Sequence, residues 1–220
     1  MLCGVFGAGG FGKEVMPLVQ CIMNDNNFCK LVFVVEDEFF HPNLSLHGYE
    51  VISMTEYLNF DGEKYYCIAI ANSHARERID VLLLENGATP IDVFAESSIK
   101  LMGNIIGPGA IFCHFSHITS DVKIGRQFHC NYYSYVAHDV IIGDYVTFAP
   151  GVKCNGGVQI EDHVYIGSGA IIKDATNSPI VIGKGAVVGM GAVVTKSVPP
   201  GVTVIGNPAK PLNKSTGIRC

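Results

Sequence analysis

The sequence has no tryptophan, few charged side chains and no long apolar run. Only 16% of its 220 residues are charged, and 20 acidic side chains outnumber 15 basic ones, which gives a net charge of −5. No basic cluster could neutralise a phosphate backbone, so we expect no nucleic-acid partner. No apolar stretch reaches the roughly 18 residues of a membrane helix, so we expect no membrane partner. With 48% hydrophobic residues, the chain should fold as a globular protein.

The eight cysteines have no spacing typical of a metal site or a disulfide framework, because no two of them form a CxxC pair. Reduced thiols are typical of the cytosol. The first residues contain neither the basic segment nor the apolar segment of a signal peptide. We therefore expect a cytoplasmic protein without a bound metal.

From about residue 101 onward, an apolar residue recurs every six positions. A period of six fits neither an α-helix nor an ordinary strand, but it is typical of a parallel β-helix in which three hexads form one triangular coil. The spacing changes once from six to ten, which predicts a four-residue insertion near residues 174–179. The expected inward positions are Ile106, Phe112, Ile118, Ile124, Cys130, Val136, Ile142, Phe148, Cys154, Ile160, Ile166, Ile172, Ile182, Val188 and Val194.

These positions predict four coils over residues 106–177 and a fifth over 182–199. Glycine often follows the inward residue, as in Ile124-Gly125 and Ile142-Gly143. Because glycine tolerates backbone conformations that other residues resist, we expect these glycines to form the corners of the prism.

The first hundred residues have a different pattern. Apolar runs at 2–6, 31–35, 65–71 and 90–94 predict strands, and helix-like segments follow the first run and the third. Pro17 should leave the first helix only loosely formed. This order predicts a small parallel sheet with helices on its faces. We therefore expect an α/β, Rossmann-like domain at residues 1–95 and an all-β, parallel β-helix domain with a C-terminal tail at residues 96–220.

Gly7, Gly9 and Gly12 form a G-x-G-x-x-G pattern between the first strand and the first helix. This arrangement points backbone N–H groups at a phosphate, although glycines that serve only a tight turn are the alternative. The domain is too short for a full dinucleotide fold, so a hydride-transfer cofactor is not expected. Glu36 and Asp37 end the second strand, where a carboxylate can reach a ribose or a base. The alternative for these two residues is a solvated loop.

His138 occupies the third place of its hexad and precedes Gly156 by one coil of 18 residues. The imidazole should therefore lie at a corner beside an unhindered backbone amide, which is what acyl transfer requires of a general base and an oxyanion donor. Asp139 could fix the tautomer of the imidazole. A histidine that only fills a subunit contact is the alternative. We interpret four other histidines as surface or interface residues: His114, His117, His129 and His163.

The segments Val136–Asp139, Ala149–Gly156 and Val204–Lys210 resemble the left-handed β-helix acetyltransferases. Together with the glycine-rich turn, they make the chain similar to the bacterial sugar acyltransferases, which include sialic acid O-acetyltransferases and nucleotide-linked 4-amino-sugar N-acetyltransferases. Within this family, Asn131–Asp139 looks most like the GDP-perosamine N-acetyltransferases, as does 145–150. Phe11 stands where many relatives carry histidine, so the nucleotide stays open.

The resemblance implies left-handed coiling and a homotrimer with acetyl-CoA in the cleft between neighbouring prisms. It implies His138 as the general base and Asp139 as its partner. The residues implied for the sugar nucleotide are Gly9, Gly10, Phe11, Glu36, Asp37, Asn72 and Asn131. Those implied for acetyl-CoA are Thr147, Gly156, Ser168 and Met190.

The expected reaction is acetylation of the C4 amine of a nucleotide-linked 4-amino-4,6-dideoxy sugar, for surface polysaccharide (O-antigen) biosynthesis. A sugar O-acetyltransferase of the sialic acid type is the first alternative, because the same base serves a hydroxyl group. A non-catalytic sugar-nucleotide-binding scaffold is the second, because repeats alone do not make an enzyme. The trimer is also expected because five aromatic side chains bring more aromatic surface to one region than the inward positions of a narrow prism can hold. These are Phe115, Tyr132, Tyr133, Tyr135 and Phe148.

Overall fold

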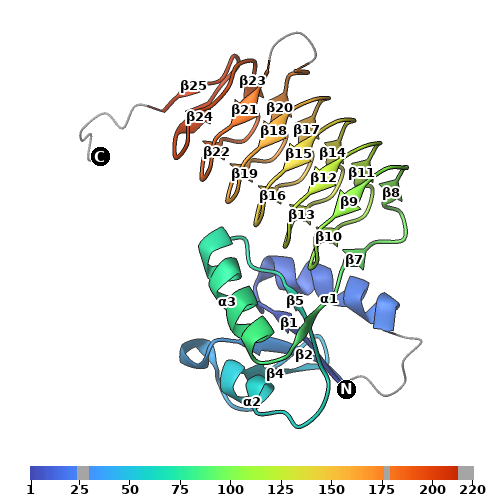
Figure 1. The fold of residues 1–220 in the computed structure, drawn as a ribbon. Helices are drawn as coiled ribbons and strands as arrows, with labels where there is room; N and C mark the ends of the chain where they lie inside the picture. The colour runs from blue at the N-terminus through green and yellow to red at the C-terminus, as the bar shows by residue number, and fades with distance from the viewer. Residues whose placement is uncertain (24–29, 176–178, 213–220) are drawn as a thin grey trace, which may run out of the picture.

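A computed structural model describes residues 1–23, 30–175 and 179–212 of the chain. An α/β domain comes first, and a left-handed parallel β-helix follows it. The α/β domain lies against one side of the β-helix, near its early coils (Figure 1). The predicted fold class is confirmed.

The N-terminal sheet has the strand order β3-β4-β2-β1-β5-β6, and only β3 and β4 pair antiparallel. Its strands are β1 (Leu2–Phe6), β2 (Lys30–Val35), β3 (Ser45–Leu46), β4 (Tyr49–Ser53), β5 (Lys64–Ile68) and β6 (Thr89–Pro90). The first three expected strands correspond to β1, β2 and β5. The chain moves outward from β1 to β2 and returns to β5 on the other side of β1, so the order reverses at β1. Ligands of open α/β sheets bind outside the carboxyl ends of the strands at such a point.

The described residues of this domain also form three α-helices and one 3-10 helix: α1 (Gly10–Met23), η1 (Asp37–Phe39), α2 (Met54–Leu58) and α3 (Ser73–Glu85). The expectation of a loose first helix is wrong, because α1 is continuous through Pro17. Val15, Met16 and Val19 bury one face of α1 against the sheet. Tertiary packing of this kind outweighs the loss of one backbone N–H donor to proline.

Three flat sheets form the β-helix. The first contains β7 (Val93–Phe94), β10 (Ile111–Phe112), β13 (His129–Cys130), β16 (Thr147–Phe148), β19 (Tyr165–Ile166), β22 (Val187–Val188), β24 (Thr203–Ile205) and the antiparallel β25 (Lys210–Pro211). The second contains β8 (Ile99–Lys100), β11 (His117–Ile118), β14 (Tyr135–Val136), β17 (Lys153–Cys154), β20 (Ile171–Ile172) and β23 (Val193–Val194). The third contains β9 (Ile105–Ile106), β12 (Lys123–Ile124), β15 (Ile141–Ile142), β18 (Gln159–Ile160) and β21 (Val181–Ile182).

The inward positions follow the predicted hexads. All of them are buried in one core except Ile106, which packs against that core while partly exposed. Ile160 pairs with Ile182, which confirms the four-residue insertion. The second sheet has six strands and therefore marks six coils, not the five that were expected. The missed coil begins at Val93, where the hexad pattern is weak because Lys100 occupies an inward position.

The glycines that follow inward residues do not form left-handed corners, so that expectation is wrong. Positive φ angles occur instead at the fourth place of the hexad, as at Gly151 (φ 74°) and Gly157 (φ 71°). Gly125 and Gly143 are required for a different reason. Each lies so close to the backbone of the next coil that a Cβ atom would collide with it.

Val93–Phe94 pairs with β10, whereas Thr89–Pro90 pairs with β5. The apolar run at 90–94 was expected to be one strand of the first domain, but it divides between the two sheets. We propose that the domain boundary lies between residues 90 and 93, a few residues before the expected 95/96. Among the described residues, no helix is both long and apolar enough to cross a membrane.

Candidate active site

His138 lies at a corner of the β-helix, immediately after β14, and its side chain is 59% exposed. Its Nδ1 atom lies 2.7 Å from Oδ2 of Asp139. Asp139 adopts a positive φ of 58°, a conformation that aspartate tolerates better than most residues. Because Nδ1–H is directed to the carboxylate, Nε2 is left as the acceptor that can take a proton from a substrate.

Gly156 occupies the same corner one coil further on, as the 18-residue spacing predicted. A Cβ atom at Gly156 would lie 2.6 Å from Cε1 and 2.8 Å from Nε2 of His138, so only glycine lets the imidazole rest against the backbone here. Within the described part of the chain, the N–H of Gly156 has no hydrogen-bond partner, whereas the next amide donates to the carbonyl of His138. A base and a free backbone donor therefore meet at one corner.

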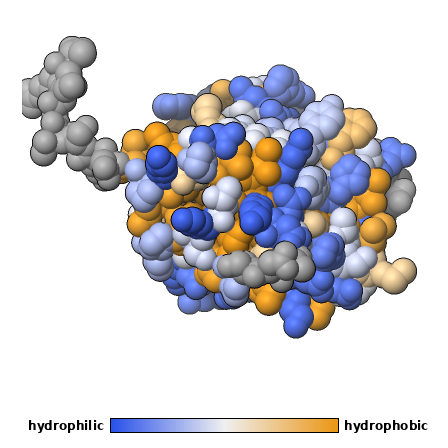
Figure 2. Space-filling view, turned by 90° about the horizontal axis from the view of Figure 1, so that it is seen from above, coloured by the Kyte–Doolittle hydropathy of each residue, from blue (hydrophilic) through white to orange (hydrophobic). Residues whose placement is uncertain are grey.

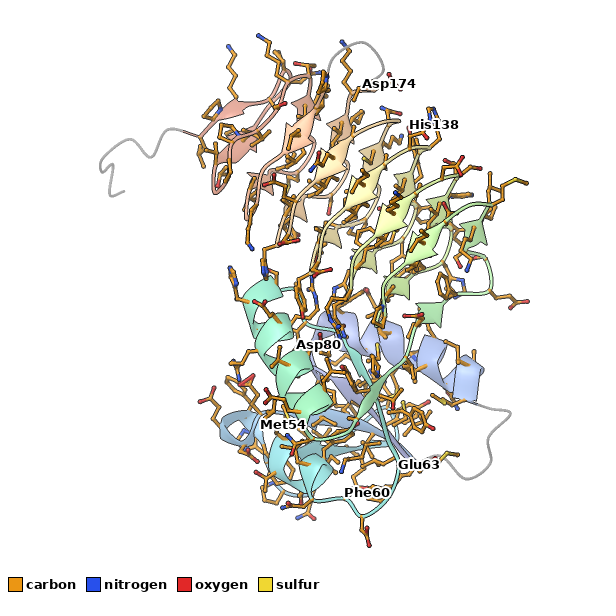
Figure 3. All side chains as sticks on the ribbon, viewed as in Figure 1. Met54, Phe60, Glu63, Asp80, His138 and Asp174 are labelled. Carbon is orange, nitrogen blue, oxygen red and sulfur yellow. The ribbon has the colours of Figure 1, made fainter. Side chains whose placement is uncertain are left out.

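Asp174 follows Gly156 by a further coil. Its Oδ2 atom would lie 3.1 Å from a Cβ at Gly156. Figure 3 shows His138 and Asp174 along the same edge of the β-helix. Sequence reasoning missed this carboxylate, although the third place of the hexad carries it in register with His138 and Gly156.

Ser168 and Met190 are exposed at the preceding corner, with 82% of Met190 exposed. This corner and that of His138 flank the second sheet. Thr147 is different, because it is only 3% exposed and its hydroxyl accepts a hydrogen bond from Arg76 at 3.1 Å. The structure therefore does not place Thr147 where acetyl-CoA could reach it.

A mainly apolar cavity of about 530 Å³ opens beside the glycine-rich turn at the carboxyl ends of β1 and β2. Its lining consists of Phe6, Gly7, Ala8, Gly9, Val34, Val35, Glu36, Phe39, Leu44, Leu46, Ile70, Ala75 and Ile79. Gly7 has a φ of 103° and turns the chain into α1, and Gly12 lies against the carbonyl of Gly7. The glycine pattern thus forms a tight turn and also borders a cavity, so a structural role in the turn and a role in ligand binding are compatible.

Glu36 lines this cavity, and both of its carboxylate oxygens accept from Nη2 of Arg78, at 2.9 and 3.0 Å. Asp37 does not line it. Its carboxylate accepts from the backbone N–H and the hydroxyl of Thr55, which lowers the pKa of Asp37. Asn72 caps α3 by accepting from the backbone N–H groups of His74 and Ala75. The carboxylate of Asp37 and the side-chain oxygen of Asn72 are therefore engaged in local structure rather than turned to a ligand.

Three further expected substrate residues, Gly10, Phe11 and Asn131, lie outside the cavity lining. Gly10 begins α1 and is exposed. Phe11 packs its ring against His129, with 5.1 Å between ring centroids. Asn131 is 8% exposed and donates to the carbonyl of Phe148 in the next coil. These contacts give Phe11 and Asn131 structural roles at the junction of the domains and within the coils.

His129 and His163 were expected at the surface or in an interface; neither is a surface residue, and both are buried where the two domains meet. His129 is fully buried, and its Nε2 atom lies 2.9 Å from the carbonyl of Ile68. His163 is 9% exposed and stacks between the rings of His74 and Tyr145. Burial lowers the pKa of both residues, and for His129 the positive charge of Arg76 lowers it further.

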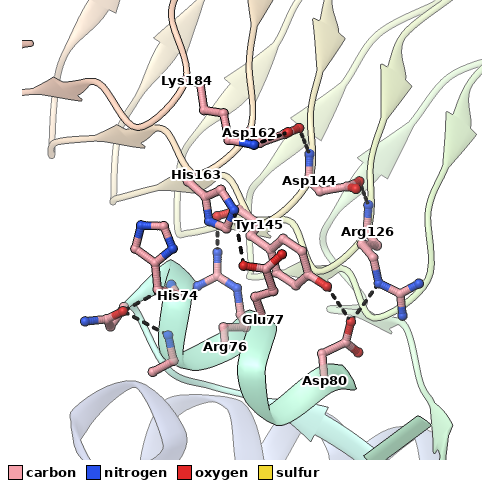
Figure 4. Close-up of polar contacts among 12 residues, drawn as sticks. His74, Arg76, Glu77, Asp80, Arg126, Asp144, Tyr145, Asp162, His163 and Lys184 are labelled. Atoms are coloured by element: carbon pink, nitrogen blue, oxygen red, sulfur yellow. Dashed lines mark hydrogen bonds and ion pairs between the residues drawn. The ribbon is translucent and has the colours of Figure 1, made fainter. Parts of the chain in front are cut away.

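His74, Glu77 and His163 place one ligand atom each within 4.8 Å of one another. Nε2 of His163 lies 3.5 Å from the Glu77 carboxylate, and the two imidazole rings stack. This group lies at the junction of α3 with the β-helix (Figure 4). The absence of a bound metal stays a prediction for this chain.

The buried state of His129 predicts a pH-dependent stability. A histidine in the unfolded chain takes up a proton below about pH 6.5, whereas His129 in the folded chain stays neutral to much lower pH. The free energy of unfolding should therefore fall as the pH drops below about 6.5. Chemical denaturation at pH 7.5 and 5.5 measures this, and His129→Gln should weaken the dependence. The exposed His41→Gln should keep the wild-type slope, and equal slopes for all three proteins would contradict the prediction.

Asp139→Asn should lower turnover by roughly tenfold, much less than loss of the imidazole, because an exposed histidine can still act as a base without its partner. Asp121 is a matched control: it occupies the same place of its hexad one coil earlier, with a φ of 60°. Steady-state kinetics should show an unchanged rate for Asp121→Asn. An Asp139→Asn rate equal to that of the wild type would remove Asp139 from the site.

Comparison with known proteins places this geometry among acetyltransferases. The family model for the PglD N-terminal domain matches residues 4–80, and that for the hexapeptide repeat of succinyl-transferase matches residues 157–196. The GDP-perosamine N-acetyltransferase of Escherichia coli O157:H7 is 46% identical over 216 residues, which cover 97% of each chain.

Two solved structures are similar over nearly the whole chain. WeeI from Acinetobacter baumannii AYE has a TM-score of 0.91 and 50% identity, over 96% of this chain and 100% of that chain. The acetyltransferase domain of PglB from Neisseria gonorrhoeae FA1090, in complex with acetyl coenzyme A, has a TM-score of 0.86 and 27% identity, over 96% of this chain and 98% of that chain.

Proposed function

Because the chain belongs to the family of hexapeptide-repeat sugar acetyltransferases that contains the GDP-perosamine N-acetyltransferase of Escherichia coli O157:H7, we propose that it transfers the acetyl group of acetyl-CoA to an amino sugar. The acceptor is the C4 amine of a nucleotide-linked 4-amino-4,6-dideoxy sugar. The observation that carries the proposal is the corner where His138 rests against the backbone of Gly156, whose N–H has no hydrogen-bond partner among the described residues. Acetyl-CoA and nucleotide sugars are cytoplasmic metabolites, which supports a cytoplasmic location and a role in making the sugars of an O-antigen.

In the proposed mechanism, the C4 amine attacks the thioester carbonyl while Nε2 of His138 accepts a proton from the amine. Negative charge then develops on the carbonyl oxygen, where the N–H of Gly156 can donate a hydrogen bond to it. The tetrahedral intermediate collapses by breaking the carbon–sulfur bond, and the imidazolium returns the proton to the departing thiolate. The products are an amide and CoA thiol. Asp139 holds the imidazole ring and stabilises its charged form.

We assign the sugar nucleotide to the cavity beside the glycine-rich turn. This cavity lies where the strand order reverses, and backbone N–H groups at the start of α1 suit a diphosphate. The carboxylate of Glu36 pairs with the exposed Arg78, and its remaining lone pairs can accept two N–H groups from the edge of guanine, whereas uracil and thymine offer only one. This difference supports a GDP-linked acceptor.

We further propose a homotrimer with active sites between subunits. His138 lies on the edge of the β-helix away from the N-terminal domain (Figure 3), so the nucleotide cavity and the base of one chain do not face each other. A neighbouring chain can bring the two together. Phe115 and Tyr133 support such a contact, because they stack with 5.1 Å between centroids while 48% and 65% exposed.

The function is tested by thiol release from acetyl-CoA over a panel of GDP-, UDP- and dTDP-linked 4-amino-4,6-dideoxy sugars, with a sialic acid as the O-acetyl acceptor. We expect rapid release with the GDP-linked amine and little with the sialic acid. A faster reaction with the sialic acid would favour the O-acetyltransferase. Binding of the sugar nucleotides without thiol release from any acceptor would favour the non-catalytic scaffold.

Gly9→Phe should weaken sugar-nucleotide binding by at least tenfold, because the ring would enter the cavity that Gly9 lines. A Cβ atom at Gly9 meets no atom within 4 Å, so the fold should tolerate the change. Calorimetry measures GDP and CoA binding separately, and the affinity for CoA should stay unchanged. Weaker CoA binding with unchanged GDP binding would contradict the assignment of the two sites.

A further inference from the structure

Arg76 joins the wall of the nucleotide cavity to the β-helix. The side chain is fully buried. Its Nη1 atom donates to the carbonyl of Ile70, at 2.6 Å, and Ile70 lines the cavity. Its Nη2 atom donates to the carbonyl of Tyr145, at 2.5 Å, and to the hydroxyl of Thr147, both in the β-helix. One planar guanidinium therefore bridges the two domains with a fixed fork of donors (Figure 4).

Asp80 makes a second bridge one turn further along α3, and it is also fully buried. Its carboxylate accepts from the side chains of Arg126 at 2.7 Å, Gln127 at 2.6 Å and Tyr145 at 2.8 Å, all three from the β-helix. It also accepts from the hydroxyl of Tyr66 in β5, at 2.6 Å. The three contacts from the β-helix are directional hydrogen bonds that a shift between the domains would break.

The bridges converge on the part of the α/β domain that forms the cavity. His129 of the β-helix holds the carbonyl of Ile68, at the end of β5, two residues before Ile70. On another face of α3, Ala75 and Ile79 line the cavity. The helix thus lies between the cavity and the β-helix and contacts both.

Buried charges are costly to desolvate, and well-packed apolar residues would hold two domains together at least as well. Directional contacts instead fix one relative orientation. We propose that Arg76 and Asp80 are positioning residues, which set the orientation of the nucleotide cavity against the β-helix so that the bound sugar reaches a His138 imidazole. This proposal rests on the proposed function.

The physical reason is the effective concentration of the amine. A bound nucleotide accelerates the reaction only while it holds the C4 amine close to the base and the thioester. A small displacement of the amine removes much of this acceleration. An amine that is not linked to a nucleotide does not depend on the cavity. Loss of positioning should therefore slow the nucleotide-linked acceptor alone.

The test compares two acceptors, the GDP-linked 4-amino sugar at saturation and the corresponding free methyl glycoside at high concentration. For Arg76→Lys we expect kcat with the linked acceptor to fall by about tenfold or more, since a lysine ammonium cannot donate hydrogen bonds to both domains in the fixed geometry of the guanidinium. The rate with the free glycoside and the Kd values of GDP and CoA should stay within a factor of two or three of the wild type. Glu85→Gln, an exposed acid on the same helix, is the control and should change neither rate.

An unchanged linked rate in Arg76→Lys, or an equal fall with both acceptors, would overturn the positioning role. If Arg76→Lys does not fold, Tyr145→Phe removes one donor to Asp80 and keeps the carbonyl that Arg76 contacts, and it should give a smaller fall of the same kind. The wild-type protein reports on the function independently. A failure of the wild type to acetylate the linked sugar would refute the function, whereas activity that is insensitive to these variants would refute only the positioning.

Discussion

Replacing His138 with alanine is expected to lower kcat by roughly 10²–10⁴-fold, the usual contribution of a positioned general base. The imidazole rests against Gly156, and its Nδ1 atom faces Asp139, so Nε2 is the group that can take the amine proton. No other described side chain combines these contacts at this corner. Because His138 is 59% exposed, its removal should leave the fold and the oligomer intact.

His114→Ala provides the matched control. His114 occupies the same place of its hexad at another corner, where its Nδ1 atom lies 2.8 Å from the hydroxyl of Ser97. Its replacement should leave kcat within a few-fold of the wild type. Circular dichroism and light scattering establish that both variants are folded and assembled. A folded His138→Ala protein with wild-type turnover would remove this residue from the mechanism.

Mixing two inactive variants is expected to restore activity if the sites are shared between subunits. One variant is His138→Ala, and the other is Ser168→Trp, which fills the exposed corner proposed to contact acetyl-CoA. In trimers formed at random from equal amounts of the two variants, about one quarter of the sites would combine an intact His138 from one chain with an intact Ser168 from its neighbour. The mixture should therefore recover a clearly measurable fraction of wild-type kcat, whereas each variant alone stays nearly inactive.

Subunit exchange must be proven in the same samples, for example by native mass spectrometry of differently tagged chains. No recovery despite exchange would show that each site is built within one chain. A fully active monomer in light scattering would show the same.

The surface seen in Figure 2 mixes hydrophilic and hydrophobic residues, and hydrophobic residues gather near the C-terminal trace.

One feature of the site was predictable because the β-helix repeats with a fixed period. A residue 18 positions ahead lies one coil up at the same corner, and this rule alone placed Gly156 beside His138. The same period predicted Phe148 at an inward position, and Phe148 is fully buried there, since inward positions of this prism hold large rings. Of the five aromatic residues behind the trimer prediction, only Phe115 and Tyr133 are largely exposed.

The junction between the domains could not be predicted. Arg76 and Asp80 lie in a charged helical segment that is typical of a solvated surface, yet both are fully buried. Their partners in the β-helix are 46 to 71 residues away in the chain, and no local pattern encodes such contacts. Asp37 and Asn72 were misjudged for a related reason. A polar residue at the end of a strand can serve a ligand or satisfy the backbone of the next helix, and here each does the latter.

We expect this chain to form an amide at C4 of a GDP-linked sugar with acetyl-CoA as donor. Wild-type protein incubated with GDP-4-amino-4,6-dideoxymannose and acetyl-CoA, followed by NMR of the purified product, tests it directly. We predict one acetyl group per sugar, on the C4 nitrogen and stable to hydroxylamine, formed in equal amount with CoA thiol. An ester on a sugar hydroxyl, or thiol release without an acetylated sugar, would contradict the account.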